Sequence, residues 1–230
     1  MRISKHNALH ISLSIIVLSW IYDIAKINYP VSPIPTDLLA LVLRIGKSKV
    51  IVFLVVFGLL RLERQTFSDI GFSKAGLMGQ ILRGLAFGLI LFITIHLIIH
   101  PVINAVLPAT AGQGPDMASY FSDVPHLIVW LLIGIVGGGF IEELQRVFVL
   151  TRFRNWMGTA GLVIALVISS IAFGMRHYYQ GLNKAIGAGI NGLLCGLIYL
   201  RKGSATEAVT AHATFDTIGI IIGYLQVQGH

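Results

Sequence analysis

Long apolar runs separated by short polar turns fill the sequence from end to end. A backbone in lipid must satisfy its hydrogen bonds internally, and these runs do not alternate in polarity as the strands of a barrel do, so they predict membrane-spanning helices. The pattern predicts an all-α, polytopic transmembrane bundle with about seven spans, within a range of roughly six to eight. The clearest spans are 8–24, 80–106, 125–150, 158–179, 184–200 and 205–226.

The segment 37–62 is the least regular part of this pattern. Two apolar runs flank the polar sequence Gly46-Lys47-Ser48-Lys49. The segment forms either an interfacial helix followed by a short span, which we favour, or one long tilted span whose basic side chains reach the membrane interface.

The distribution of basic residues predicts the orientation in the membrane. The N-terminus and the turns 61–76, 152–155 and 201–202 are basic, whereas the loop 108–124 contains no Lys or Arg. By the positive-inside rule, the N-terminus lies inside and the C-terminus outside. No small-residue cleavage site follows the first apolar run, so that run is expected to be a retained helix.

Composition supports a membrane protein over a soluble one. Of the 230 residues, 55% are hydrophobic and 12% are charged, against about 25% charged in soluble domains. The mean hydropathy is +0.81. We therefore expect one integral membrane domain over residues 1–230, with core helices at 125–226. The net charge of +7 does not indicate a nucleic-acid partner, because the basic residues are scattered near span ends, where lipid headgroups explain them.

Ionisable residues inside the apolar runs mark the candidate site. A charge at membrane depth costs about 2.5–3.5 kcal/mol on insertion scales, so function is the first hypothesis for such a residue. The span 125–150 carries two adjacent glutamates and an arginine, and later spans carry further polar positions at helical spacing. These residues are Glu142, Glu143, Arg146, Phe173, His177, Asn191, His212 and Asp216.

This set of side chains suits hydrolysis. A buried glutamate can act as general base on a water molecule, and a histidine can donate to the developing oxyanion or protonate the leaving amine. Glu142, His177, His212 and Asp216 also make a plausible zinc set, although the HExxH signature is absent. The residues leave zinc-dependent and metal-free hydrolysis equally open.

Each of these positions also has a structural interpretation. Glu142 and Arg146 can form a buried ion pair, His177 can cap the end of its helix, and His212 with Asp216 can join two helices by hydrogen bonds. The single cysteine, Cys195, excludes an internal disulfide and suits a small buried side chain.

Three motifs on successive helices resemble one known family. The sequences Glu142-Glu143-Leu-Gln-Arg146, Phe173-Gly-Met-Arg-His177 and His212-Ala-Thr-Phe-Asp216 are similar to those of the CPBP intramembrane proteases, which include CAAX proteases, bacteriocin-processing enzymes and the Rce1-type type II CAAX prenyl endopeptidases. The resemblance covers roughly 138–220. The family pattern is E-E-x-x-x-R, whereas Arg146 comes one residue earlier here.

The resemblance implies an integral-membrane endopeptidase in a bacterial inner membrane that cuts a peptide or membrane-protein substrate. Glu142 would be the base and Glu143 its support, with His177 and His212 across the scissile bond and Arg146, Phe173, Asn191 and Asp216 supporting them. The family includes members viewed as metalloproteases and members viewed as metal-free. Two other functions stay open: a catalytically silent scaffold or immunity protein, and a small transporter, which predicts an internal repeat that we do not find.

The predicted turns place the three motifs at unequal depths. Glu142 and His212 each lie about ten residues from a basic turn, whereas His177 lies more than twenty residues beyond Arg154, about 30 Å along a helix. The site therefore assembles only if the span beginning at 158 starts late, after Gly158-Thr-Ala-Gly161, or is tilted.

Overall fold

The computed structural model describes residues 4–25, 34–107 and 120–229, and this part of the chain is helical and contains no strand. The predicted all-α class is confirmed. The helices are α1 (Lys5–Ala25), α2 (Leu38–Leu62), α3 (Leu77–Thr94), α4 (His100–Val106), α6 (Val124–Leu132), α7 (Glu143–Arg176), α8 (Leu182–Lys202) and α9 (Ala205–Gln228). Short 3₁₀ turns, η2 (Phe67–Ile70) and η5 (Tyr178–Gln180), and π-helical segments, η3 (Ile95–Ile99) and η4 (Ile133–Glu142), connect or interrupt them.

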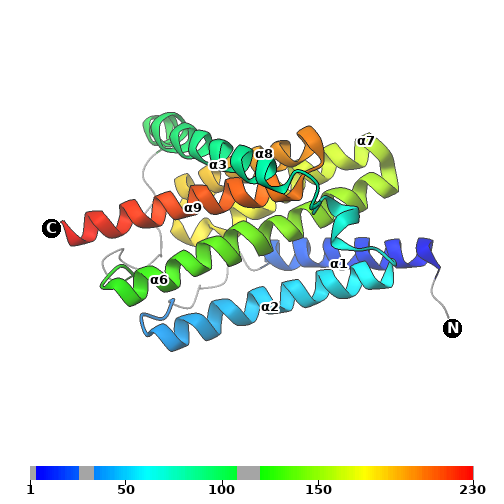
Figure 1. Ribbon diagram of the computed structural model, residues 1–230, viewed down its shortest axis with the longest axis horizontal. Coiled ribbons are helices and arrows are strands. Elements are labelled where there is room, and N and C mark those ends of the chain that lie inside the picture. The colour runs from blue at the N-terminus through cyan, green and yellow to red at the C-terminus, as the bar shows by residue number, and fades with distance from the viewer. Residues whose placement is uncertain (1–3, 26–33, 108–119, 230) are drawn as a thin grey trace.

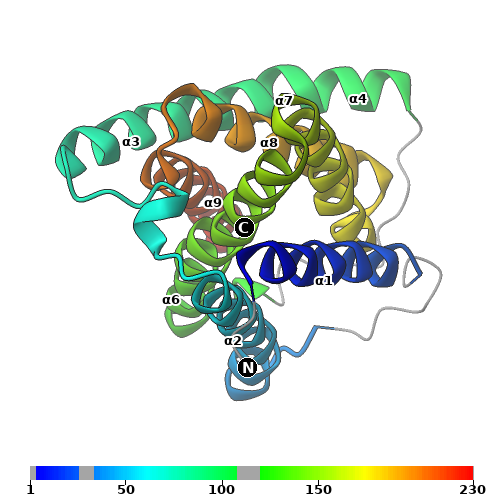
Figure 2. The same ribbon diagram turned by 90° about the vertical axis from the view of Figure 1, so that its right-hand side faces the viewer.

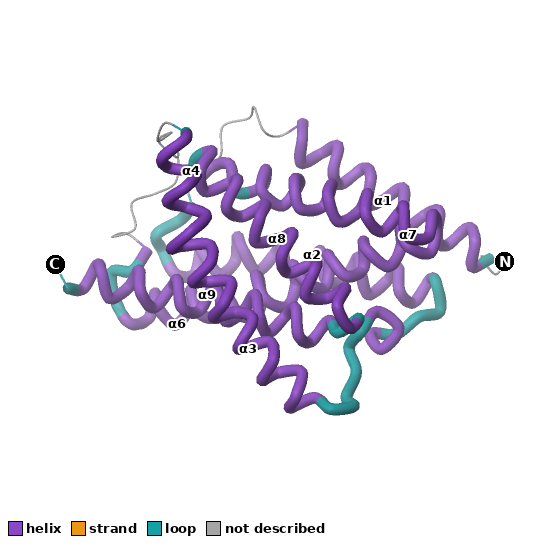
Figure 3. The backbone as a smooth tube through the Cα atoms, turned by 90° about the horizontal axis from the view of Figure 1, so that it is seen from above, coloured by secondary structure: helices purple, strands orange, loops and turns teal. Residues whose placement is uncertain are grey.

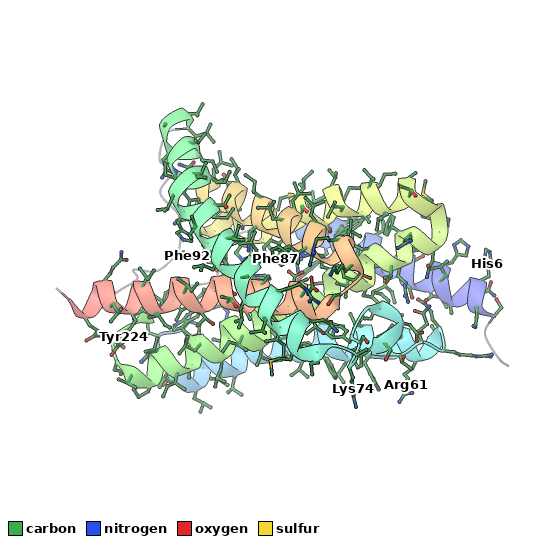
Figure 4. The ribbon with its side chains drawn as sticks, turned by 45° about the horizontal axis from the view of Figure 1, so that its top comes forward. His6, Arg61, Lys74, Phe87, Phe92 and Tyr224 are labelled. Carbon is green, nitrogen blue, oxygen red and sulfur yellow. The ribbon has the colours of Figure 1, made fainter. Side chains whose placement is uncertain are left out.

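The helices form one bundle, and one long helical segment, Leu77–Val106, crosses it. Helices α2, α6 and α9 run along the long axis (Figure 1), and α3, η3 and α4 continue one another across the top of the bundle (Figure 2). Seen from above, α1 lies alongside α7 (Figure 3). Phe87 and Phe92 lie where α3 crosses α9 (Figure 4), and Gly84 and Gly88 allow that crossing to be close, because an added Cβ would meet Thr210 and Thr214.

Four stretches of the described chain are long and apolar enough to cross a membrane. They are Lys5–Ala25, Leu77–Val106, Val124–Arg176 and Ala205–Gln228. The chain is therefore an integral membrane protein, but the count of about seven spans is not confirmed. Helix α2 carries Arg44, Lys47 and Lys49 in its first half, and α8 mixes apolar residues with polar ones.

Helix α2 corrects the favoured interpretation of segment 37–62. The segment is one continuous helix that begins after Asp37, whose side chain accepts a hydrogen bond from the Ala40 amide at 2.8 Å. The sequence Gly46-Lys47-Ser48-Lys49 does not interrupt it, since a single glycine costs a helix only about 1 kcal/mol. The segment is thus one long helix, as the alternative expected, but it is not among the four candidate spans of the described chain.

A sharp reversal divides α7 into two antiparallel arms. The backbone leaves helical geometry at Met157 and Gly158, and Gly158 has φ 61° and ψ −140°, a conformation that essentially requires glycine. The prediction of a turn at 152–155 is wrong, because Arg152 is helical and fully buried. An arginine beside apolar residues suggests the membrane interface. The Arg152 guanidinium instead pairs with Glu63 inside the protein, at 2.7 Å.

The later position of this turn removes the depth problem. Glu142 and His177 lie at similar distances along the chain on either side of Gly158. The second arm begins directly after Gly158, so the expected late start of this span is wrong. The longer first arm brings the two motifs to the same level instead. This is seen where Arg176 donates to the Gln145 side-chain oxygen at 3.2 Å.

Apolar side chains fill the interior and also cover much of the outside. The main buried cluster joins α1, α2 and both arms of α7, with Leu144, Val147 and Leu150 fully buried at its centre. Large apolar residues such as Leu18, Leu97 and Leu132 are more than half exposed. Such a surface suits contact with lipid and would be unusual in water.

Candidate active site

The π-helical segment η4 carries the two glutamates into the centre of the bundle. Its Gly137-Gly138-Gly139 run lets three different groups approach the backbone. A Cβ at Gly137 would crowd the Lys49 stem, one at Gly138 would clash with the Asp216 carboxylate, and one at Gly139 would lie 2.6 Å from the Ala213 Cβ. Segments of π-helix recur at functional sites because they shift side chains out of the ordinary helical register.

Glu143 is fully buried, and both of its carboxylate oxygens have hydrogen-bond partners. Arg146 donates through Nε to both carboxylate oxygens at 3.1 Å, and His212 Nδ1 lies 2.8 Å from Oε1. The Arg146 guanidinium also lies over the Phe173 ring, with Cζ 4.7 Å from its centroid. The arginine that arrives one residue early in the motif therefore pairs with the second glutamate.

His212 lies between two carboxylates. Its Nδ1 donates to Glu143, and its Nε2 is 3.7 Å from Asp216 Oδ2, a separation that allows an ion pair but exceeds a hydrogen bond. Both ring nitrogens thus face acceptors, an arrangement that suits the imidazolium form. The proton on Nε2 is then not held by Asp216 in a hydrogen bond.

Glu142 has a different environment from its neighbour. Its Oε1 accepts a hydrogen bond from Lys49 Nζ at 2.5 Å, and its side chain is 17% exposed, compared with 0% for Glu143. It lines a small pocket together with Trp20, Gln145, Phe173 and Arg176. Of the two glutamates, Glu142 is the one that lines the pocket.

His177 caps the second arm of α7 and completes this group. Its Nδ1 lies 2.9 Å from the Phe173 carbonyl oxygen, which can only accept, so Nδ1 carries the proton and Nε2 is left with its lone pair in the neutral ring. Its ring is 4.7 Å from that of Phe173, and it lies within electrostatic reach of Glu142. The three predicted motifs thus meet in one place.

Asn191 belongs to the wall of the site. It is buried on α8, and its side-chain oxygen is 3.9 Å from the Cys195 sulfur. One residue later, Gly192 allows the Arg146 guanidinium to approach, since an added Cβ would lie 2.9 Å from Nη1. Helix α8 therefore confines the arginine against Phe173 and Glu143.

The side chains as arranged do not fit a bound metal ion. The ligand atoms of Glu143, Cys195 and His212 lie within 4.8 Å of one another, and this is not the set predicted from the sequence. Both oxygens of Glu143 are held by a guanidinium, and Glu142 is held by an ammonium. A divalent cation here would sit against these positive charges, which compete for the same oxygens.

Sequence reasoning missed Lys49, which reaches the site from α2. It lies 93 residues before Glu142, in the segment whose basic residues suggested the membrane interface. One signal was available: Arg146 can serve only one of two adjacent buried carboxylates well, so a second cation was required from another helix.

The comparisons with known proteins agree with the motifs. Residues 124–218 match the family model described as type II CAAX prenyl endopeptidase Rce1-like. Neither a curated protein nor a solved structure gives a match to the chain. The matched segment runs from the start of α6 into α9 and contains both glutamates, Arg146, His177 and His212. Residues 124–218 are thus similar to the Rce1-like domain of the type II CAAX prenyl endopeptidases, and we refer to them below as the Rce1-like domain.

Proposed function

We propose that this protein is an intramembrane endopeptidase of the CAAX-protease type that uses Glu142 to activate water. One observation carries the proposal: two adjacent glutamates are held in different ways. Glu143 is saturated by Arg146 and His212, whereas Glu142 faces the pocket and is held through one oxygen. Environments that separate two neighbouring carboxyl groups assign them different roles, here base and support.

The reaction follows from these positions. Glu142 takes a proton from a water molecule as the water oxygen attacks the scissile carbonyl carbon, and the carbonyl oxygen becomes an oxyanion. When the tetrahedral intermediate collapses, the carbon–nitrogen bond breaks and Glu142 returns its proton to the leaving amine. General base catalysis of this kind contributes about 10²–10⁴-fold to a rate.

The histidines complete the site from two different helices, His177 from the end of α7 and His212 from α9. His212 carries an Nε2 proton outside any hydrogen bond to Asp216, so we assign it to the oxyanion. His177, with Nδ1 committed to the Phe173 carbonyl, presents Nε2 to the water or the leaving amine. Arg146, Glu143, Phe173, Asn191 and Asp216 hold these groups in place.

The substrate we propose is a peptide or membrane protein that reaches the pocket from the bilayer, and the compartment is a bacterial inner membrane. The exposed apolar surface and the four candidate spans support a site that receives its substrate from lipid. We propose that the protein cuts its substrate without a metal cofactor and that it does not bind nucleic acid.

The test is peptide cleavage by purified protein in detergent, with wild type compared with Glu142→Gln, Glu143→Gln and His212→Asn. We expect Glu142→Gln to lower kcat by about 10³-fold while the protein stays folded, since the general base is lost. Asp69→Asn is the matched control, because it makes the same carboxylate-to-amide change in the η2 turn outside the site. Full activity of Glu142→Gln would contradict the assignment of Glu142 as the general base.

Chelation separates the metal-free mechanism from a zinc-dependent one. We expect cleavage to persist after dialysis against 1,10-phenanthroline, because Lys49 and Arg146 already neutralise the glutamates. Loss of activity that added zinc restores would contradict this expectation.

A catalytically silent scaffold or immunity protein is the second candidate. The close Lys49–Glu142 pair favours it, because a purely structural carboxylate needs nothing more than such a partner. This function predicts that no peptide in a broad panel is cut, and that Glu142→Gln changes only the thermal stability.

A further inference from the structure

Lys49 is a charged feature of the site that the family match does not cover. It lies on α2, outside residues 124–218, yet its ammonium is 2.5 Å from Glu142 Oε1. The two side chains are 24% and 17% exposed, so the pair is largely withdrawn from solvent. An ion pair in such a place costs desolvation, and it persists only when its geometry is supported by its surroundings.

The contact is supported along the whole lysine side chain. At Gly137, an added Cβ would lie 3.3 Å from Lys49 Cε and 3.7 Å from Cγ, so the glycine leaves room for the stem to lie on the η4 backbone. Lys47, on the same helix, is exposed. The Lys49 side chain is thus packed along the η4 backbone, unlike a solvent-exposed surface lysine.

The neighbouring cations are committed elsewhere. Arg146 donates to both oxygens of Glu143, and His212 Nδ1 is directed at the same carboxylate. Within the described residues, Lys49 is the basic side chain in salt-bridge contact with Glu142. Without it, Glu142 would be a carboxylate at membrane depth, while Arg146 serves Glu143.

We propose that Lys49 is a positioning residue of the hydrolytic site: its ammonium fixes Glu142 Oε1 and leaves Oε2 to take the proton from water. The inference rests on the proposed function and extends it to a helix outside the Rce1-like domain. Lys49 stays protonated throughout, while Glu142 accepts the proton from water and returns it to the leaving amine. A side chain thus supplies the positive charge that a metal ion supplies in metalloproteases.

The first test separates kcat from KM in the variants Lys49→Met, Lys49→Arg and Lys47→Met, measured with a peptide that wild type cleaves. We expect Lys49→Met to lower kcat by about 30-fold or more with KM within about twofold, because an interaction of the reacting groups is lost and not substrate binding. Lys49→Arg should recover part of that loss, and Lys47→Met should match wild type. Unchanged kcat in Lys49→Met would overturn the proposal.

Chemical rescue tests the charge itself. The chain has a single cysteine, Cys195, which is fully buried, so Lys49→Cys creates one accessible thiol. Alkylation with 2-bromoethylamine rebuilds an ammonium of nearly the length of lysine, whereas iodoacetamide adds a neutral group. We expect activity to return with the first reagent and not with the second; equal effects of both would overturn the proposal.

A double-mutant cycle on thermal stability keeps the inference separate from the proposed function. Lys49→Met should lower Tm by about 4 °C or more in wild type, and much less in a Glu142→Gln background, because no carboxylate is then left unpaired. Additive effects would overturn the ion pair whatever the activity. An inactive wild type would show that the proposed function has failed, whereas an active Lys49→Met protein would show that this inference alone has failed.

Discussion

At the scale of single residues, Arg146 pairs with one of the two adjacent glutamates, Glu143. It lies three residues after Glu143 on a regular helix, and its Nε reaches both carboxylate oxygens at 3.1 Å. Residues at this spacing face one another on a helix, so the pair forms without help from another element. The shorter motif therefore commits the arginine to Glu143 and leaves Glu142 to another cation.

Loss of Arg146 should destabilise the protein strongly. In Arg146→Gln, Glu143 stays buried with His212 as its remaining partner, and a buried pair broken on one side costs about 3–5 kcal/mol. Thermal unfolding in detergent measures this loss. Arg154→Gln, an exposed change in the same arm of α7, should leave the midpoint within about 1 °C.

The double variant Arg146→Met with Glu143→Gln is the complementary measurement. We expect it to be more stable than Arg146→Gln, because the uncompensated charge is gone. Equal instability of the two proteins would contradict the view that an unpaired Glu143 is the source of the loss.

Arg146 and Lys49, the partners of the two glutamates, show which contacts can be predicted from the sequence. Arg146 lies close to Glu143 in the chain, so helical spacing alone allows their contact to be predicted. Lys49 lies on another helix, and its contact with Glu142 depends on how α2 is rotated and shifted against η4. No spacing rule fixes that register without an alignment of related sequences.

At the scale of elements, the glycine run of η4 sets the distance to α9. Ala213 approaches Gly139 so closely that an added Cβ would lie 2.6 Å from its Cβ and 3.0 Å from its Cα. His212 and Asp216 stand on the same helix, on either side of this contact. The position of both side chains relative to the glutamates therefore depends on a backbone approach that only glycine permits.

Gly139→Ala should separate these two elements. The neighbouring atoms include backbone, which cannot move aside as a flexible side chain can, so we expect a loss of about 1–3 kcal/mol in stability and a fall in activity. Gly58→Ala is the matched control, since nothing lies within 4 Å of its added Cβ on α2. That substitution should be neutral or slightly stabilising. Similar losses for both variants would show that helix propensity, and not close packing, is responsible.

Element boundaries were predictable where apolar runs were long and uninterrupted. The helices α1 and α9 begin and end within a few residues of the predicted spans 8–24 and 205–226. The turn at Gly158 was misplaced because Arg152, Arg154 and the following asparagine have the composition of a membrane interface. Arg152 lies inside the bundle because Glu63 is there to receive it, a fact of tertiary structure.

At the scale of the whole molecule, the N-terminal helices neutralise the charges of the Rce1-like domain. Glu142 pairs with Lys49, Arg152 with Glu63, Arg176 with Asp23, and Glu207 with Arg83. Glu207 is fully buried and is also held by Arg201 at 2.5 Å. The domain that the family model recognises therefore depends on α1, α2 and α3 for its electrostatic balance.

The pair between Glu63 and Arg152 is the most deeply buried of these connections. It joins the end of α2 to the first arm of α7, and the Ser12 hydroxyl of α1 donates to the second oxygen of Glu63. The guanidinium also donates to the Gln65 side chain at 2.5 Å and lies over the Phe148 ring. Three helices thus meet at one buried carboxylate, far along the chain from the reacting groups.

Substitution of Arg152 should lower the stability of the protein with little effect on kcat. Arg152→Met leaves Glu63 buried without its cation, and we expect a loss of about 3–5 kcal/mol, seen as a lower midpoint of thermal unfolding. Adding Glu63→Gln should recover much of it, because the unpaired charge is removed. Below the midpoint, kcat for a cleaved peptide should stay within about threefold of wild type, since no reacting group is touched. A large fall in kcat at full folding would instead show that the N-terminal helices set the geometry of Glu142 through this junction as well as through Lys49.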